Sequence, residues 1–268
     1  MVDPDIATAL SALGLEPEAA EDITALRWGD GRRVTVRVRL RGGGSVKVRR
    51  NRPHKLATFA ALVRALDDPR LPRVLAATDG FTVEEWVEGT PLAELPLAPE
   101  RLAQVADLLG SLHTRPRVRA RRTAGVVEHA RRQLGALAAA GALAPGAGRR
   151  LACLLDEAPA RAPVGVVHTD VCAENLVEDP AGRIHAIDND GMQLGFLDHD
   201  LARTWYLWPM PAPSWRLLEE RYQTWRPPDD RVRFWRCEAT LKAAYLRLTR
   251  GGGLERPLAR LAELAAGP

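Results

Sequence analysis

The chain has 268 residues, of which 46% are hydrophobic and 27% charged, and a formal net charge of +4. It can form one large domain or two smaller ones with a proper core, and the composition is ordinary for a soluble globular protein. No apolar run reaches the length of a membrane span, and the acidic N-terminus (Asp3, Asp5) is not typical of a signal peptide. Three cysteines without paired spacing argue against a disulfide framework or a zinc cluster. We therefore expect a cytoplasmic protein with no membrane partner.

The first ninety residues are predicted to be mostly antiparallel strands. Residues 33–41 alternate valine or leucine with polar residues, which is the period of a half-buried strand, and three glycines then turn the chain into a second strand over 45–49. The other elements predicted in this part are a helix over 5–14, a helix over 55–66 and short strands over 73–77 and 81–87.

From residue 99 the apolar period becomes helical. Helices are predicted over 99–112, 122–143 and 148–157, and again through most of 198–268, with a strand-rich segment at 164–190. We therefore predict an α+β fold with a small antiparallel-sheet lobe over residues 1–88 and a larger, mainly helical lobe over 89–268.

One polar pattern stands out in the strand-rich segment. The run His168-Thr-Asp170 is followed by Asn175, two short strands joined by a turn, and Asp188 at the end of the second strand. Phosphoryl transfer needs a carboxylate that orients a hydroxyl, and a carboxylate with an amide that hold Mg²⁺ on nucleotide phosphates. The alternative is that these are ordinary loop-capping residues, because Asp and Asn are common in turns.

The surrounding segments resemble the aminoglycoside phosphotransferase family, whose members are small-molecule kinases with a two-lobed protein-kinase-like fold. The similar stretches are VGVVHTD before Asp170, AIDNDGMQLGFLDHDLA around Asp188, the strand VEEWVEGTPL and the helix LLGSLH. Together they cover residues 30–250 in order. The resemblance implies ATP and Mg²⁺ as cofactors, with Asp170 as catalytic base, His168 bracing its loop, and Asn175 and Asp188 holding the metal.

The resemblance also implies roles for other positions. Asp200 corresponds to the structural acid that anchors the catalytic loop, and Asp190 either assists the metal or is solvated. Lys47 would bind nucleotide phosphates, with Arg49 on the same strand face as its competitor. The backbone carbonyl of Glu85 and the amide of Val87 would bind adenine. The glycines of the loop 28–33 are a candidate phosphate-covering turn or an ordinary hairpin entry.

One departure concerns the support of Lys47. Kinase-like proteins place a glutamate on the following helix to pair with this lysine, and Phe59 stands at that position here. Residues 31–55 hold ten Lys or Arg and no acid, so Lys47 could also be one more solvated strand residue. The basic hairpin is not favoured as a nucleic-acid surface, because it lacks interleaved aromatic residues for base stacking.

The C-terminal third carries a cluster of aromatic residues for which core packing is favoured over an aromatic acceptor pocket, namely Trp205, Tyr206, Trp208, Trp215, Trp225 and Trp235. Residues 203–268 hold twelve Lys or Arg against seven Asp or Glu, so a polycationic aminoglycoside is not favoured as substrate. We predict an ATP- and Mg²⁺-dependent phosphotransferase that acts on a hydroxyl of a small molecule, such as an antibiotic, a sugar or an amino alcohol. The alternatives are a non-catalytic nucleotide-binding regulator and a kinase for a peptide side chain. The sequence identifies neither the acceptor nor the oligomeric state.

Overall fold

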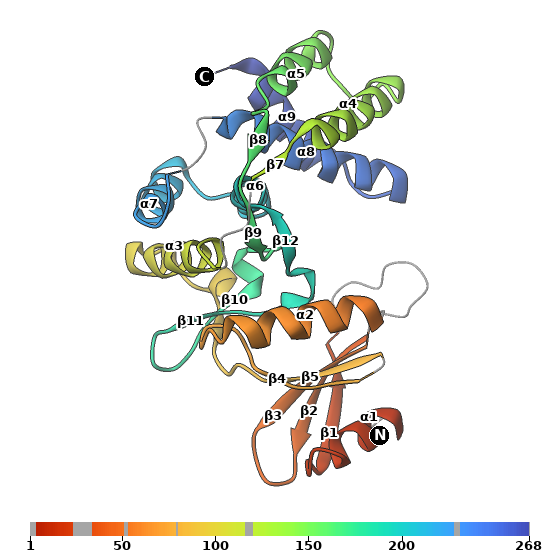
Figure 1. The fold of residues 1–268 in the computed structure, drawn as a ribbon, viewed down its shortest axis with the longest axis vertical. Coiled ribbons are helices and arrows are strands. Elements are labelled where there is room, and N and C mark those ends of the chain that lie inside the picture. The colour runs from red at the N-terminus through yellow and green to blue at the C-terminus, as the bar shows by residue number, and fades with distance from the viewer. Residues whose placement is uncertain are drawn as a thin grey trace. The chain divides into compact units, whose positions relative to one another are not determined.

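The computed structural model describes residues 4–23, 34–50, 53–78, 80–115, 120–227 and 231–267. The chain forms two compact units (Figure 1). Unit 1 comprises Met1–Pro96 and Ala173–Gln193, and unit 2 comprises Leu97–Cys172 and Leu194–Pro268. Relative to the lobes expected at 1–88 and 89–268, unit 1 therefore also includes residues 89–96 and the hairpin segment 173–193.

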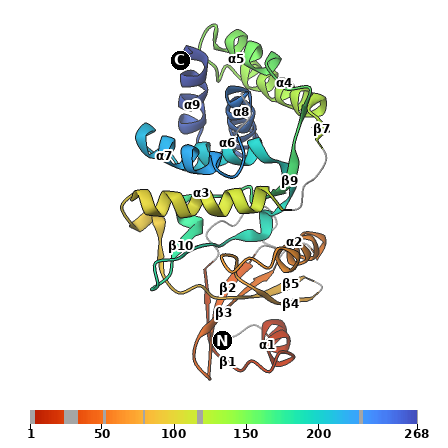
Figure 2. The same ribbon diagram turned by 60° about the vertical axis from the view of Figure 1, so that its left-hand side comes forward.

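Unit 1 is built on a five-stranded antiparallel sheet in the order β1-β2-β3-β5-β4. Its strands are β1 (Pro17–Asp22), β2 (Val34–Leu40), β3 (Ser45–Arg50), β4 (Val74–Thr78) and β5 (Phe81–Glu85). Two helices accompany it, α1 (Pro4–Ser11) and α2 (Pro53–Leu66), and they lie on opposite faces of the sheet in both Figure 1 and Figure 2. The edge strand β1 was not predicted, because its sequence PEAAED has no alternation.

Alternation in the central strands divides the sheet into an apolar and a polar face. Side chains on one face pack with α1 in a hydrophobic core, and this core contains Ile6, Leu10, Val36, Val38, Val46, Val48 and Val83. The opposite face carries polar side chains, namely Thr35, Arg37, Lys47, Arg49, Thr82 and Glu84. The polar face is where the candidate site of unit 1 lies.

A β-hairpin adds a second small sheet to unit 1. Strands β10 (Leu176–Glu178) and β11 (Ile184–Ala186) pair in antiparallel register, and β10 also pairs with β6 (Thr90–Pro91). The turn between them is closed by Asp179, whose carboxylate accepts the backbone N–H groups of Ala181 and Arg183. This is the hairpin predicted between Asn175 and Asp188, and it sets the ends of both strands side by side.

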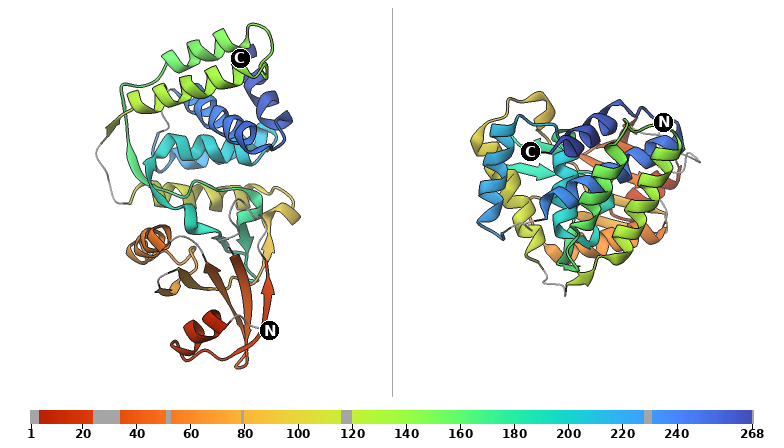
Figure 3. Two further views of the ribbon diagram at one scale, coloured as in Figure 1. Left: turned by 90° about the vertical axis from the view of Figure 1, so that its right-hand side faces the viewer. Right: turned by 90° about the horizontal axis from the view of Figure 1, so that it is seen from above.

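Unit 2 is mainly helical (Figure 3). Its helices are α3 (Pro99–His113), α4 (Ala124–Ala139), α5 (Ala147–Asp156), α6 (Leu197–Leu207), α7 (Ala212–Gln223), α8 (Val232–Arg250) and α9 (Glu255–Ala266). The short strands are β7 (Arg121–Arg122), β8 (Arg161–Ala162), β9 (Val164–Val167) and β12 (Gln193–Phe196), with β7 paired to β8 and β9 to β12. Across the described part of the chain, none of the helices has the length and apolar character needed to cross a bilayer.

The core of unit 2 contains residues of α4, α5, α6, α8 and α9, with Phe234 and Trp235 fully buried at its centre. Trp208 and Trp215 are also buried, which confirms core packing for these tryptophans, whereas Trp225 is exposed and the prediction is wrong for it. The hollow beside Trp215 has a volume of about 10 Å³, which is no larger than the space for one water molecule. Among the described residues, the space beside Trp215 is therefore too small for an acceptor.

Candidate active site

Lys47 lies on the polar face of unit 1 and is paired with an acid from the neighbouring strand. The antiparallel register places Lys47 directly opposite Glu84, and its Nζ lies 3.7 Å from Glu84 Oε2 and 4.0 Å from Asp188 Oδ1. Burial, followed by the positive charge of Arg49, lowers the pKa of Lys47, while the carboxylates act in the opposite direction. Lys47 is therefore a buried, acid-paired lysine and not a solvated strand residue.

Glu84 supplies the carboxylate that the helix does not. Phe59 on α2, which stands where the resemblance places a glutamate, is fully buried. Glu84 is also fully buried, and Thr82 Oγ1 donates a hydrogen bond of 3.0 Å to its Oε1. Because Lys47 and Glu84 are cross-strand partners, the acid reaches the lysine within the sheet. Sequence reasoning missed this role, which depends on the register of two strands 37 positions apart in the chain.

Arg49 is fully buried on the same face, next to Lys47, and is therefore not a solvated strand residue either. Its Nη2 lies 2.5 Å from Asp188 Oδ1, and its Nη1 lies 2.6 Å from Asp190 Oδ1. Burial alone would lower the pKa of Arg49, but the carboxylates of Glu84, Asp188 and Asp190 raise it above its usual value. Asp190 was expected either to assist a metal or to be solvated, and the structure instead pairs it with Arg49.

A cavity of about 300 Å³ within unit 1 brings together several predicted site residues. Its lining comprises Ile23, Thr35, Lys47, Pro72, Glu85, Trp86, Val87, Gly89, Pro91, Asn175, Val177, Ile187 and Asp188. The apolar members suit a planar aromatic base, and the polar members gather three groups that can bind phosphate or metal. The predicted adenine-binding segment, Glu85 and Val87, lines this same cavity. The glycine loop 28–33 lies outside the described residues.

Gly89 follows this segment and allows a close approach of the backbone. A Cβ at this position would lie 2.1 Å from the carbonyl oxygen of Glu178 in β10, so no larger residue fits without a shift of the backbone. The hairpin is thus packed tightly against the segment that would bind adenine.

Asn175 and Asp188 lie at the two ends of the β10–β11 hairpin. The backbone N–H of Ile187 donates a 2.8 Å hydrogen bond to the carbonyl oxygen of Asn175. Asp188 has a left-handed backbone conformation, with φ of 60°, and begins a short 3-10 helix over Asn189–Gly191. One carboxylate and one amide oxygen fit Mg²⁺, which is usually held by one or two carboxylates with water and phosphate oxygens. In the described residues, no group of three or more His, Cys, Asp or Glu forms a metal cluster made by the protein alone.

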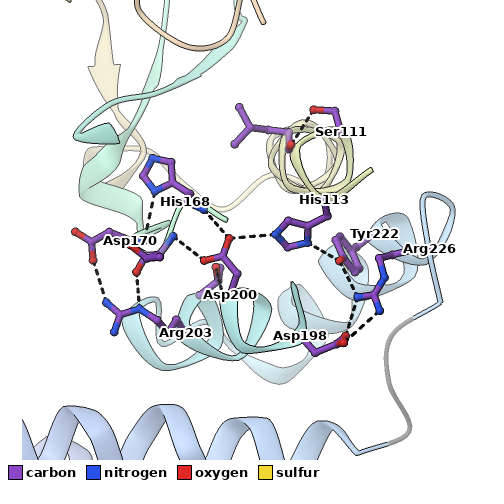
Figure 4. A network of polar contacts seen from close by, with 12 residues as sticks. Ser111, His113, His168, Asp170, Asp198, Asp200, Arg203, Tyr222 and Arg226 are labelled. Atoms are coloured by element: carbon purple, nitrogen blue, oxygen red, sulfur yellow. Dashed lines mark hydrogen bonds and ion pairs between the residues drawn. The ribbon is translucent and has the colours of Figure 1, made fainter. Parts of the chain in front are cut away.

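In unit 2, Asp200 on α6 holds the loop that carries Asp170 (Figure 4). Asp200 accepts the backbone N–H groups of His168 at 2.9 Å and Thr169 at 2.7 Å. The backbone N–H of Asp170 in turn donates to His168 Nδ1 at 3.3 Å, the kind of contact that a bracing role for His168 requires. The predicted anchoring contact of Asp200 with this loop is confirmed.

Arg203 is a second contact of this loop that the sequence reasoning missed. Its Nη2 lies 3.6 Å from Asp170 Oδ1, and its Nε donates to the carbonyl oxygen of Thr169. Thr169 has a φ of 70°, a strained conformation for a β-branched residue. Because Asp200 binds the N–H of Thr169 and Arg203 binds its C=O, α6 fixes this conformation from both sides. The one available signal was the position of Arg203, three residues after Asp200 on a predicted helix.

A buried chain of hydrogen bonds continues from Asp200 to α7 (Figure 4). His113 Nε2 lies 3.1 Å from Asp200 Oδ2, and His113 Nδ1 lies 2.6 Å from the hydroxyl of Tyr222. Since an ionised carboxylate only accepts, Nε2 donates to Asp200, and in the neutral imidazole Nδ1 then accepts from the Tyr222 hydroxyl. Burial raises the pKa of Tyr222 to about 12. Arg226 completes the chain by donating to Tyr222 and, through two nitrogens, to Asp198.

The sheet with its buried Lys47, the hairpin with Asn175 and Asp188, and the helical unit with its Asp170 loop define a two-lobed kinase-like phosphotransferase fold of the α+β class. Residues 22–235 match the sequence model of the phosphotransferase enzyme family, and the chain belongs to this family. The resemblance to aminoglycoside phosphotransferases is thereby confirmed. A sequence search found no match among curated proteins.

Solved structures with this fold cover nearly the whole chain at low sequence identity. A macrolide 2'-phosphotransferase from Brachybacterium faecium has 16% identity and a TM-score of 0.68, covering 98% of this chain and 97% of its own. A putative fructosamine-3-kinase from Thermobifida fusca has 19% identity and a TM-score of 0.69, covering all of both chains. A choline kinase from Cryptosporidium parvum has 13% identity and a TM-score of 0.68, covering 98% and 95%. These similarities establish the fold.

Proposed function

We propose that this protein transfers the γ-phosphoryl group of ATP, as its Mg²⁺ complex, to a hydroxyl of a small molecule. The observation that carries the proposal is the cavity of unit 1, where Lys47, Asn175 and Asp188 line the same space as Glu85 and Val87. An adenine nucleotide with a bound metal requires three features in one site: a cation for the phosphates, a carboxylate with an amide for the metal, and a backbone segment beside an apolar slot for the base.

Each residue has a definite part in this proposal. Lys47 binds the phosphates as a fixed cation, held by Glu84, and the backbone of Glu85 and Val87 binds the adenine edge. Asn175 and Asp188 hold Mg²⁺, which, when bound, neutralises charge on the phosphate oxygens.

Asp170 accepts a hydrogen bond from the acceptor hydroxyl and orients it, while His168 braces the loop. The contacts of Asp200 and Arg203 support this part, because they fix the backbone immediately before Asp170.

The acceptor is proposed to be a molecule without clustered positive charge. Arg203 lies 3.6 Å from Asp170, and it would repel a polycationic acceptor at the point of reaction. The excess of basic residues after position 203 acts in the same direction. Macrolide, sugar-amine and amino-alcohol phosphotransferases share the fold, so these acceptor classes are the first to test.

Two alternative functions predict different results in the same assay. The alternative of a non-catalytic nucleotide-binding regulator was based on the absent helix glutamate. Because Glu84 pairs with Lys47 in its place, the reason for this alternative is weaker. A kinase for a peptide side chain would use the same nucleotide site with a different acceptor.

The test is an ADP-release screen of the full chain with ATP and Mg²⁺ over macrolides, sugars, ketosamines, amino alcohols, aminoglycosides and a peptide library. Acceptor-dependent ADP release with a neutral or monocationic small molecule, abolished by EDTA, is expected. Tight ATP binding with no transfer to any acceptor would favour the regulator, and transfer to peptides alone would favour the peptide kinase. Either result would contradict the proposal.

A further inference from the structure

Arg49 is a buried cation for which the phosphotransfer chemistry outlined above has no assigned use. It lies two residues after Lys47 on β3, so both side chains are on the polar face of the sheet. Arg49 does not line the nucleotide cavity and has no exposed surface. Its guanidinium group therefore reaches Asp188 and Asp190 without lining the cavity itself.

The two ends of its guanidinium group bind two different carboxylates. Nη2 lies 2.5 Å from Asp188 Oδ1 and Nη1 lies 2.6 Å from Asp190 Oδ1. The guanidinium fork is planar and permanently charged, so it can bridge two carboxylates and cannot relieve its burial by losing a proton. A buried arginine that lost these partners would be strongly destabilising, and the pairing is therefore persistent.

Asp188 and Asp190 flank the single residue Asn189 at the start of a 3-10 helix. Asn189 is itself fixed, because it is fully buried and its Nδ2 donates to the carbonyl oxygen of Ala186 at 3.1 Å. Two carboxylates presented on one short, rigid turn form an arrangement that attracts a cation. In this chain the positive charge between Asp188 and Asp190 is the guanidinium group of Arg49.

We propose that Arg49 takes the place of a second divalent cation between Asp188 and Asp190, so that the chain binds one metal ion per nucleotide. The inference rests on the proposed function, in which Asn175 and Asp188 hold that one ion. A second divalent ion at Asp190 would lie beside a buried positive charge and would be repelled by it. Lys47 and Arg49 together then supply two fixed positive charges near the phosphates.

The test is a Mn²⁺ titration of the full chain with a non-hydrolysable ATP analogue, in which free Mn²⁺ is followed by electron paramagnetic resonance. The wild type is expected to bind one Mn²⁺ per nucleotide. Arg49→Lys keeps the charge and serves as the matched control, with one Mn²⁺ expected. Arg49→Gln removes the charge, and a second Mn²⁺ is expected to bind at a concentration at least roughly tenfold lower than in the wild type.

A second variant makes the test independent of whether Arg49→Gln folds. Asp190→Asn is expected to retain one Mn²⁺ with an affinity within about twofold of the wild type, because Asp190 binds Arg49 and not the metal. A tenfold loss of Mn²⁺ affinity in this variant would make Asp190 a metal ligand and overturn the inference.

The result for the wild type distinguishes failure of the inference about Arg49 from failure of the proposed function. Two Mn²⁺ ions per nucleotide in the wild type would overturn the inference and leave the proposed function intact. No Mn²⁺-dependent binding of the nucleotide analogue at all would overturn the proposed function itself, and the inference with it.

Discussion

Substitution of Glu84 by glutamine removes one negative charge from a buried site that holds two positive charges. Lys47 Nζ lies 3.7 Å from one carboxylate oxygen of Glu84, and Arg49 Nε lies 3.9 Å from the other. Glutamine keeps the shape of the side chain and can still accept the hydrogen bond from Thr82. The variant therefore tests the charge of Glu84 and not its packing.

The expected magnitude follows from these distances. With an effective dielectric constant of about 20, each of the two attractions is worth about 4 kcal/mol before desolvation is counted. Desolvation of the glutamate offsets much of this, and loss of one partner from a buried ion pair typically costs about 3 to 5 kcal/mol. We expect the free energy of unfolding to fall by about 3 kcal/mol, because glutamine retains the Thr82 contact.

The assay combines thermal unfolding with nucleotide binding. A loss of 3 kcal/mol corresponds to a decrease in Tm of roughly 6 to 12 °C for a chain of this size. The dissociation constant for ATP should rise by roughly tenfold, because Lys47 loses the acid that holds it. The matched control is Glu85→Gln, which removes the exposed pair with Arg73 and should cost less than about 1 kcal/mol.

Unchanged Tm and unchanged ATP affinity in Glu84→Gln would refute the assignment of Glu84 as the partner of Lys47. Equal losses in Glu84→Gln and Glu85→Gln would refute the argument that burial sets the strength of the pair.

Two further predictions concern the hairpin and the buried network. Gly89→Ala should lower the free energy of unfolding by about 3 kcal/mol, because its Cβ would collide with the carbonyl oxygen of Glu178. Thermal unfolding measures this, and Gly42→Ala, where the added Cβ meets nothing, should be nearly neutral. Burial raises the pKa of Tyr222 from 10.0 to about 12. The contribution of this side chain to stability is therefore complete below pH 10, and it is lost as the pH rises to 12, because the unfolded chain ionises first. Urea unfolding between pH 9 and 12 should show the wild type losing roughly 2 kcal/mol more stability than Tyr222→Phe, and parallel curves for the two proteins would refute the prediction.

Local sequence patterns were sufficient for much of the fold. The alternation in β2 and β3, the three glycines between them and the helical spacing in α3 each predicted the element that the structure contains. The β10–β11 hairpin was predicted from two short apolar runs around a turn, and with it the proximity of Asn175 and Asp188. These features depend on neighbours in the chain, which the sequence displays directly.

The features that were missed depend on pairing across long separations. Strand β1 is held by its register with β2, and its own residues are half-buried or exposed, so no apolar alternation marks it. Arg49 and Lys47 are buried because acids from β5 and the segment after β11 reach them, although no acid lies near them in the sequence. The role of Glu84 likewise follows only from the register of β3 with β5.

Asp170 is proposed to orient the acceptor hydroxyl for phosphoryl transfer, and the rest of the proposed function depends on this role. The most direct test measures both turnover and ATP affinity in Asp170→Asn, with the acceptor found in the ADP-release screen. We predict that turnover falls by at least roughly a thousandfold, while the dissociation constant for ATP changes by less than about threefold. Turnover close to that of the wild type would contradict the assignment. Loss of ATP binding in a folded variant would instead make Asp170 a structural residue, and would equally contradict it.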